Sequence, residues 1–244
     1  MANTIYSKVT IEPQEAMDKI CDMIESMPHA DYGKETKVIV ESFYTEEEIK
    51  STYGNGQTEY PITEDGVNHS WLYDYVGSKW LTVGVDDDIR IESAGSTPDR
   101  FLIKLYNICS NQFENVVVDC KWYDESETEC GVAKVMNGIY TEDESFLETD
   151  EIWDAAYYVE GDEDIDDVKE YLISQKSSYL TEDKINEMDE DEMRDTFSQW
   201  KNEEKWDDIS NKWDDMLDSC QEAIETEDFD FPISKIILIT EKVS

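Results

Sequence analysis

A run of 70 residues from Asp162 to Phe231 contains neither glycine nor proline, so no residue within it is a strong helix breaker. From Trp206 onward the apolar residues recur at steps of three or four, which is the stripe of a long amphipathic helix. We predict a helix from about Asp189 to Glu225, which would be about 55 Å long at about 1.5 Å per residue. The tryptophans of the run fall at this helical spacing, so we interpret them as core residues.

The acidic residues of the chain are concentrated around this run. Residues 143–230 carry 33 acidic and 7 basic side chains, whereas the other 156 residues carry 28 and 13. A surface acidified for high salt would spread its charge evenly, so the concentration disfavours that explanation. Only Arg194, Lys201, Lys205 and Lys212 accompany the acids of the predicted long helix, although (i, i+4) ion pairs would stabilise it. We interpret the run as an ordered negative surface.

A negative surface of this kind resembles the backbone of a nucleic acid. B-form DNA carries about one negative charge per 1.7 Å of its axis, and carboxylates on two antiparallel helices would present a comparable density. We therefore hypothesise a non-enzymatic DNA mimic that blocks a basic, nucleic-acid-binding host protein. The carboxylates that we expect to contact this partner are Asp189, Glu190, Asp191, Glu203, Asp207, Asp208, Asp214, Asp215 and Asp218.

The total charge limits the other partners. The formal net charge is −41, which repels nucleic acid and anionic membranes, so we expect neither to bind directly. An alternative is an acidic structural or interaction module that binds a basic protein without mimicking DNA. A metal-dependent enzyme that uses clustered carboxylates is a third hypothesis, but the sequence offers no liganding geometry for one.

Strand and helix signals alternate in the first 142 residues. The residues that we expect to form strands are 4–11, 37–44, 81–85, 89–92, 115–123 and 131–136. Helices are expected over residues 13–27, after a capping box at Thr45 and Glu48, and after Thr97 as the N-cap. Asn137-Gly138 predicts a turn at the end of the last strand. This order predicts an α+β fold, a ferredoxin-like split βαβ sandwich.

The remaining chain is expected to add two parts to this sandwich. Residues 143–231 would form an acidic, mainly helical arm, with one helix near Ile165 to Leu172 and another beginning at Thr181. Residues 232–244 would form a buried-type strand, Ser234 to Val243, that returns to pair with the N-terminal sheet. The expected domains are therefore 1–142, 143–231 and 232–244.

Three short motifs carry a resemblance to a known family. They are Gly-Ser-Lys-Trp at 77–80, Ser-Ala-Gly-Ser-Thr-Pro at 93–98, and Trp-Tyr-Asp-Glu at 122–125 followed by Cys-Gly at 130–131. In order and spacing they resemble the ferredoxin-like domain of Api-like and YubB-like proteins of phages and conjugative plasmids. The resemblance covers about residues 1–140. It implies an α+β fold and a mobile-element origin, and it brings no catalytic residues.

Catalytic and metal-binding motifs are nearly absent from the sequence. The two histidines, His29 and His69, lie in polar turn regions without a nearby nucleophile, and no phosphate loop or GxSxG elbow occurs. The acidic stretch from Asp162 to Asp167 lacks the glycine and the glutamate that a calcium loop requires. We expect no catalytic residue, cofactor or metal. The five scattered cysteines and the missing signal core and membrane span predict a cytoplasmic protein.

Overall fold

The computed structural model describes residues 3–51, 60–64, 66–125, 129–146, 165–174, 180–227 and 233–239. The chain divides into two compact units: unit 1 consists of Met1–Phe146 and Asp215–Ser244, and unit 2 of Leu147–Asp214. These boundaries differ from the expected arm over 143–231. Residues 143–146 and the segment that follows Asp214 belong to unit 1.

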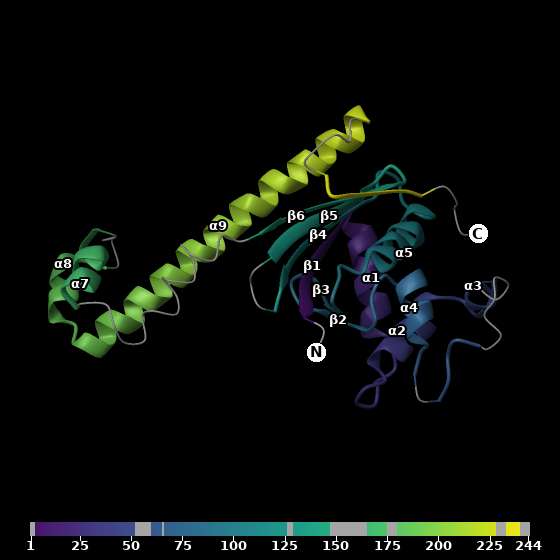
Figure 1. The fold of residues 1–244 in the computed structure, drawn as a ribbon, viewed down its shortest axis with the longest axis horizontal. Coiled ribbons are helices and arrows are strands. Elements are labelled where there is room, and N and C mark those ends of the chain that lie inside the picture. Colours follow the sequence, from purple (N-terminus) through teal and green to yellow (C-terminus); the bar gives the residue numbers. More distant parts are fainter. Residues whose placement is uncertain are drawn as a thin grey trace. The chain divides into compact units, whose positions relative to one another are not determined.

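Unit 1 is built on an antiparallel sheet whose seven described strands have the order β2-β3-β1-β4-β5-β6-β7 (Figure 1). The predicted α+β class is confirmed. The strands are β1 Thr4–Glu12, β2 Leu81–Val85, β3 Ile89–Ala94, β4 Val117–Asp124, β5 Glu129–Met136, β6 Ile139–Phe146 and β7 Lys235–Leu238. The helices that precede β6 in the chain are α1 Gln14–Glu25, α2 Glu35–Phe43, α3 Glu46–Ser51, α4 His69–Tyr75 and α5 Asp99–Ser110.

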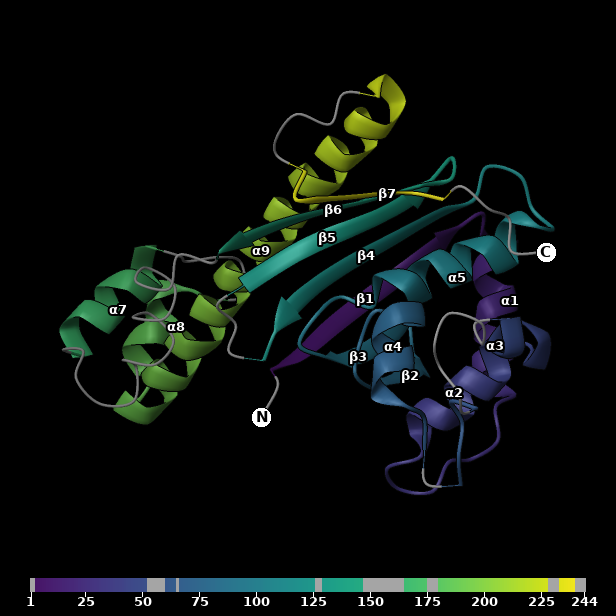
Figure 2. The ribbon, with the colours of Figure 1, turned by 45° about the vertical axis from the view of Figure 1, so that its right-hand side comes forward.

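Helices cover one face of the sheet, which we call the first face. We call the opposite face the second face. Helices α1, α2, α4 and α5 lie over the first face (Figure 2). On this face Val9 of β1 is in register with Ile89 of β3 and Cys120 of β4, and all three side chains are fully buried. Because successive residues of a strand point to opposite faces, Tyr6 and Lys8 of β1 lie on the second face.

A β-branched triplet predicted a strand over residues 37–44, but residues 37–43 belong to helix α2 and Tyr44 is its C-cap. Ile39 and Phe43, four residues apart, are both buried, which is the spacing of a helical face. The hydroxyl of Thr36 donates to the Leu81 carbonyl oxygen at 2.9 Å and accepts from the Leu81 N–H at 3.1 Å, so it holds the start of α2 against β2. β-Branching lowers helix propensity by only tenths of a kcal/mol, about 0.5 per residue, and packing outweighs it.

The hairpin signals gave one correct prediction and one omission. β5 is the predicted hairpin partner of β4, and it ends at Asn137 and Gly138, whose φ angles of 54° and 76° suit a tight two-residue turn. That turn leads into β6, which we did not predict. The central residues of β6 read Thr-Glu-Asp-Glu, and strands are depleted in acids. Glu142 and Asp143 are nevertheless buried.

The two predicted helix caps in unit 1 had different outcomes. At α3 the capping box is confirmed: the Thr45 hydroxyl accepts from the Glu48 N–H at 3.1 Å, and Glu48 Oε2 accepts from the Thr45 N–H at 2.6 Å. At α5 the predicted cap is wrong, because the helix begins one residue later with Pro98 in the capping position and no side-chain cap. Thr97 is buried and its hydroxyl bonds the Glu142 carboxylate instead.

Unit 2 contains helices α7 Ile165–Ser174 and α8 Glu182–Glu187 and most of α9 Glu190–Thr226. The predicted helices are confirmed, and Thr181 caps α8 by accepting from the Lys184 N–H at 3.4 Å. α9 has 37 residues, which matches the predicted span to within one residue at each end. The core of the unit consists of Val168, Leu172, Leu180, Ile185 and Phe197.

The last described segment is strand β7. It pairs antiparallel with β6, from Lys235 opposite Glu142 to Leu238 opposite Ile139, so a final strand does return to the sheet. The expected strand continued to Val243, and residues 240–244 lie outside the described part. The interpretation as a buried strand is wrong, because Leu238 is 60% exposed and β7 is the last strand of the sheet order.

Candidate partner-binding surface

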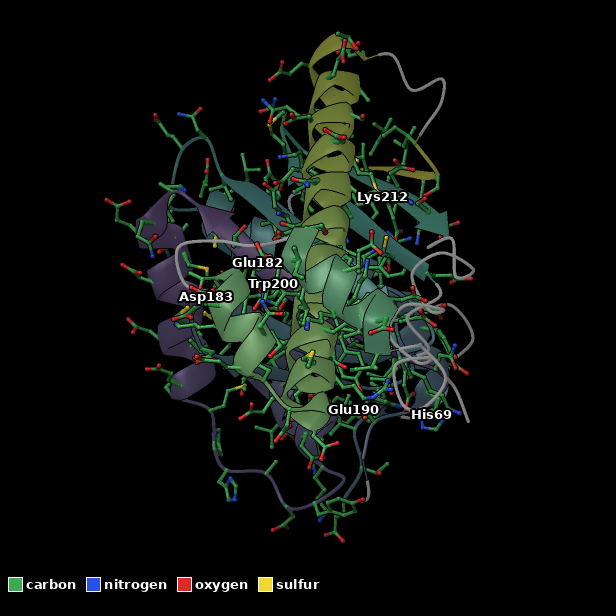
Figure 3. All side chains as sticks on the ribbon, turned by 90° about the vertical axis from the view of Figure 1, so that its left-hand side faces the viewer. His69, Glu182, Asp183, Glu190, Trp200 and Lys212 are labelled. Atoms are coloured by element: carbon green, nitrogen blue, oxygen red, sulfur yellow. The ribbon has the colours of Figure 1, made fainter. Side chains whose placement is uncertain are left out.

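The start of α9 is fixed by its own acidic side chains. Asp189 Oδ1 accepts from the Glu192 N–H at 2.9 Å, and Glu192 Oε2 accepts from the Asp189 N–H at 3.2 Å. This reciprocal pair is a capping box. Glu190, labelled at the beginning of the helix in Figure 3, accepts from Arg194 Nη2 at 3.0 Å. Two of the predicted contact residues, Asp189 and Glu190, therefore have local structural partners.

Three predicted contact residues lie on one side of the helix within unit 2. Glu203, Asp207 and Asp214 are exposed and follow one another at steps of four and seven residues, which return to the same side. Glu203 accepts a hydrogen bond from the Gln199 amide at 3.1 Å, and this neutral donor leaves the full negative charge in place. The side chain of Asp208 lies outside the described part of the structure.

The last turns of α9, within unit 1, continue the pattern. Asp215 and Asp218 are exposed, and so are Glu222 and Glu225, which we did not predict as contacts. Steps of three and four residues connect all four carboxylates. Extending the helical period of the sequence beyond Asp218 would have found the last two. Cys220 on the other side of these turns is fully buried and hydrogen-bonded to Thr141 of β6.

The acidic surface of α9 is not one uninterrupted face. Trp200 packs against the core of unit 2, whereas Ile209, nine residues later, is 2% exposed. Nine residues at about 100° each make about two and a half turns, so Ile209 lies on the opposite side of the helix from Trp200 and the buried side of the helix changes between them. Asp191, twenty-seven residues before Asp218, consequently lies about half a turn around the helix from it. Asp191 therefore lies on a different side of the helix from these exposed carboxylates.

We define the carboxylate stripe as the exposed acids at helical spacing in α9 from Glu203 to Glu225. Its members are Glu203, Asp207, Asp214, Asp215, Asp218, Glu222 and Glu225. The stripe thus holds five of the nine predicted contact residues.

The described bases of α9 are occupied by neighbouring groups. Arg194 pairs with Glu190, and its side chain is 23% exposed. The Nζ of Lys201 lies 4.2 Å from the centre of the Tyr171 ring, a cation–π contact, and Lys201 is half-buried. Lys212 is also half-buried. These three basic side chains are thus partly withdrawn from solvent, whereas the members of the carboxylate stripe are exposed.

A polar network in unit 1 was not predicted. Tyr140 donates to Glu142 at 2.9 Å, and Lys235 Nζ lies 2.9 Å from Asp99 Oδ2 and 3.8 Å from Glu142. Burial raises the pKa of Glu142, and burial with the nearby Glu142 charge raises the pKa of Tyr140. Because its members come from α5, β6 and β7, no local signal could reveal it. A hollow of about 300 Å³ lined by Glu142 and Lys235 adjoins it.

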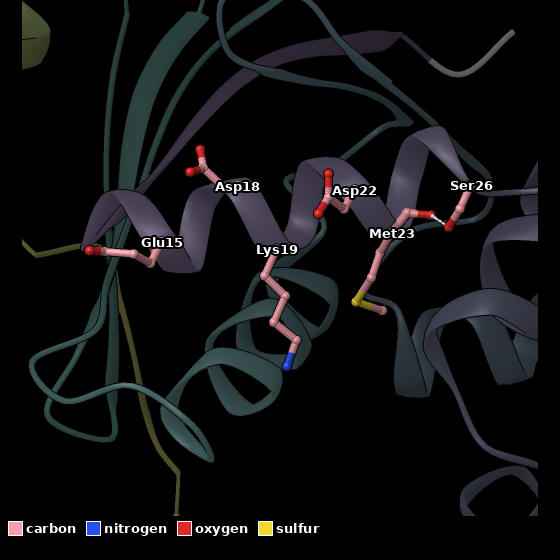
Figure 4. Close-up of a pocket in the computed structure, with 6 residues that line it drawn as sticks. All are labelled: Glu15, Asp18, Lys19, Asp22, Met23 and Ser26. Carbon is pink, nitrogen blue, oxygen red and sulfur yellow. Dashed lines mark hydrogen bonds between the residues drawn. The ribbon is translucent and has the colours of Figure 1, made fainter.

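Other titratable groups lie on α1 and at the two histidines. A hollow of about 440 Å³ on α1 is lined by Glu15, Asp18 and Asp22, with Lys19 turned to the Ile108 carbonyl oxygen (Figure 4). His29 and His69 are exposed, and His69 is the first residue of α4 rather than part of a turn. Within the described ranges no group of three His, Cys, Asp or Glu could hold a metal ion.

Comparison with known proteins gives no name to this arrangement. No protein-family model, curated protein or solved structure matches the chain. Among the described helices, none is long and apolar enough to cross a membrane.

Proposed function

We propose that the protein is a non-enzymatic binding protein whose carboxylate stripe mimics the DNA backbone and occupies the basic groove of a nucleic-acid-binding protein. The observation that carries the proposal is the stripe itself. Exposed carboxylates recur at helical spacing from Glu203 to Glu225, while the described bases of α9 are half-buried. A merely soluble helix would gain stability from exposed (i, i+4) pairs.

The spacing of the stripe suits a surface that binds phosphates. Steps of four and seven residues correspond to about 6 and 10 Å along a helix. Phosphates repeat about every 3.4 Å along one DNA strand, so the carboxylates match about every second or third phosphate. Lysine and arginine side chains are long and flexible enough to accept this difference. An acidic face would also speed association with a basic groove and make it salt-dependent.

The topology supports a ferredoxin-like origin for unit 1. The strands β2-β3-β1-β4 are neighbours in that order, with helices following β1 and β3 in the chain. This is the arrangement of a split βαβ unit, to which β5, β6 and β7 are added. The resemblance to Api-like and YubB-like proteins remains a prediction. It favours a bacterial host protein, for example a defence nuclease or a transcription protein, as the partner.

The test is capture of a partner from bacterial lysate followed by elution with double-stranded DNA. The proposal expects a basic protein that DNA displaces in competition. The variant carrying Glu203→Lys, Asp207→Lys, Asp214→Lys and Asp218→Lys should capture none of it while keeping its helical circular dichroism.

A matched control is available on α1. Glu15, Asp18, Asp22 and Glu25 are exposed at steps of three, four and three residues, so their change to lysine alters the net charge equally. The control variant should keep the partner. Equal loss in both variants would show that net charge alone drives binding. A partner that DNA does not displace would support an acidic interaction module without mimicry.

A further inference from the structure

Three basic side chains stand side by side on the second face of the sheet. Lys8 of β1 is in register with Arg90 of β3 on one side and with Lys121 of β4 on the other. Lys8 and Arg90 are exposed and Lys121 is half-buried. With neighbouring strands about 4.8 Å apart, the three side chains form a row about 10 Å wide. We call these three residues the basic row.

The basic row brings three like charges next to one another. Like charges directly opposite each other on neighbouring strands destabilise a sheet. Lys8 forms no ion pair with any residue that the structure describes. The chain has 61 acidic and 20 basic residues, so an acid at one of these three positions would be the expected composition. Three adjacent basic side chains in so acidic a chain form a local positive surface, which suits a negatively charged ligand.

Two aromatic rings lie next to the basic row. Tyr6 and Tyr123 are the cross-strand neighbours one step along β1 and β4, and their rings stack with centroids 5.4 Å apart. Both side chains are partly exposed. Partly exposed aromatic rings beside a row of basic side chains are the two elements that bind single-stranded nucleic acid. Nucleobases stack on the rings, and phosphates pair with the cations.

Acidic groups near the basic row weaken its attraction for phosphates and shorten the distance over which it acts. Asp86 pairs with Arg90 at 2.6 Å, but both side chains are more than half exposed, so the pair is weak. Glu92, opposite Tyr6, accepts a long 3.5 Å bond from Thr82. At physiological salt, charges separated by more than about 8 Å are largely screened. A flexible strand that touches the row can therefore bind despite the acidic remainder of the chain.

We infer that the second face of the sheet binds single-stranded nucleic acid, with phosphates on Lys8, Arg90 and Lys121 and a base on Tyr6 or Tyr123. An intact duplex keeps its bases stacked inside and offers none to the rings. An acidic peptide would use the basic row but gain nothing from the rings. The expectation of no direct nucleic-acid binding rested on the total charge of the chain, which does not show where the basic side chains lie.

The test measures fluorescence anisotropy of labelled thymidine and uridine oligomers of about ten nucleotides at about 50 mM salt, where phosphate contacts are strongest. The full chain should bind one or both, and more weakly as salt rises. Lys8→Glu should weaken binding about tenfold or more through the lost phosphate contact. Tyr6→Leu and Tyr123→Leu keep the charge and should each weaken it by about fivefold or more through lost stacking.

Two controls make the outcome decisive. Lys34→Glu changes the net charge equally at a partly exposed position outside the sheet and should leave binding unchanged. Melting curves show whether each variant is folded. Absence of oligonucleotide binding by the wild-type chain would overturn the inference. So would binding that polyglutamate abolishes and that the tyrosine variants do not weaken, because the occupant would then be an acidic protein. Neither result concerns the carboxylate stripe, since its partner is tested with other variants.

Discussion

The carboxylate stripe of α9 and the basic row of the sheet are both rows of like charges, but they arise differently. The stripe follows from the helical period, so Glu203 and Asp207 are neighbours because they are four residues apart. The basic row follows from strand register, which brings Lys8 beside Arg90 and Lys121 from distant parts of the chain. Total charge describes the first surface and conceals the second. A strongly acidic protein can carry a local positive surface.

The comparison holds only if the exposed basic side chains bind a ligand and do not stabilise the fold. Lys134 of β5 provides the contrast, because it lies on the same face, is 5% exposed and pairs with Asp119 at 2.7 Å. Lys134→Ala leaves Asp119 without this cation, so the free energy of unfolding should fall by about 3 kcal/mol. Lys8→Ala should change it by less than about 0.5 kcal/mol. Urea denaturation measures both, and equal losses would make the basic row structural.

A charge reversal at the centre of the basic row sharpens the comparison. Lys8→Glu replaces two repulsive cross-strand neighbours by attractive ones, so the free energy of unfolding should rise by about 0.5–1 kcal/mol. The same variant should lose oligonucleotide binding. A gain in stability with a loss of binding is the signature of a site kept for function. Destabilisation in urea would instead mean that Lys8 supports the sheet.

The corresponding change in the carboxylate stripe should have a smaller effect. Asp207→Lys places a cation four residues after Glu203, the favourable orientation for a helical pair, and should stabilise unit 2 by about 0.3–0.5 kcal/mol. Asp207→Asn serves as the control, since it removes repulsion without adding a pair and should give a smaller gain. Thermal melts at low and high salt measure both. A gain that persists at high salt would exclude the ion pair as its cause.

The sequence predicted the elements that depend on local signals and missed those that depend on contacts between distant segments. α9 was predicted almost to its ends because its period and its acidic first turn are local. β6 was missed because its acids, Glu142 and Asp143, are buried only through contacts made by other segments. α2 was predicted as a strand because its β-branched triplet outweighed the burial pattern of Ile39 and Phe43, which only tertiary packing reveals.

The two candidate surfaces also differ in how far the sequence alone predicts them. The sequence contains the carboxylate stripe, and it also contains the change of buried side between Trp200 and Ile209, once the two halves of α9 are treated separately. The stacking of Tyr6 on Tyr123 requires the register of β1 on β4, which brings together residues 117 positions apart. No periodicity within a single segment carries that information.

The hydroxyl of Thr36 has a consequence for how this sheet can grow. It occupies both hydrogen-bonding groups of Leu81 at the first residue of β2, so another strand cannot pair there. An edge strand with open backbone groups invites chain addition and aggregation, and this contact closes that end. The strands that extend the sheet, β5, β6 and β7, lie beyond β4 at the other border. A single side-chain contact thus caps the start of one edge strand, while the sheet is extended at the opposite border.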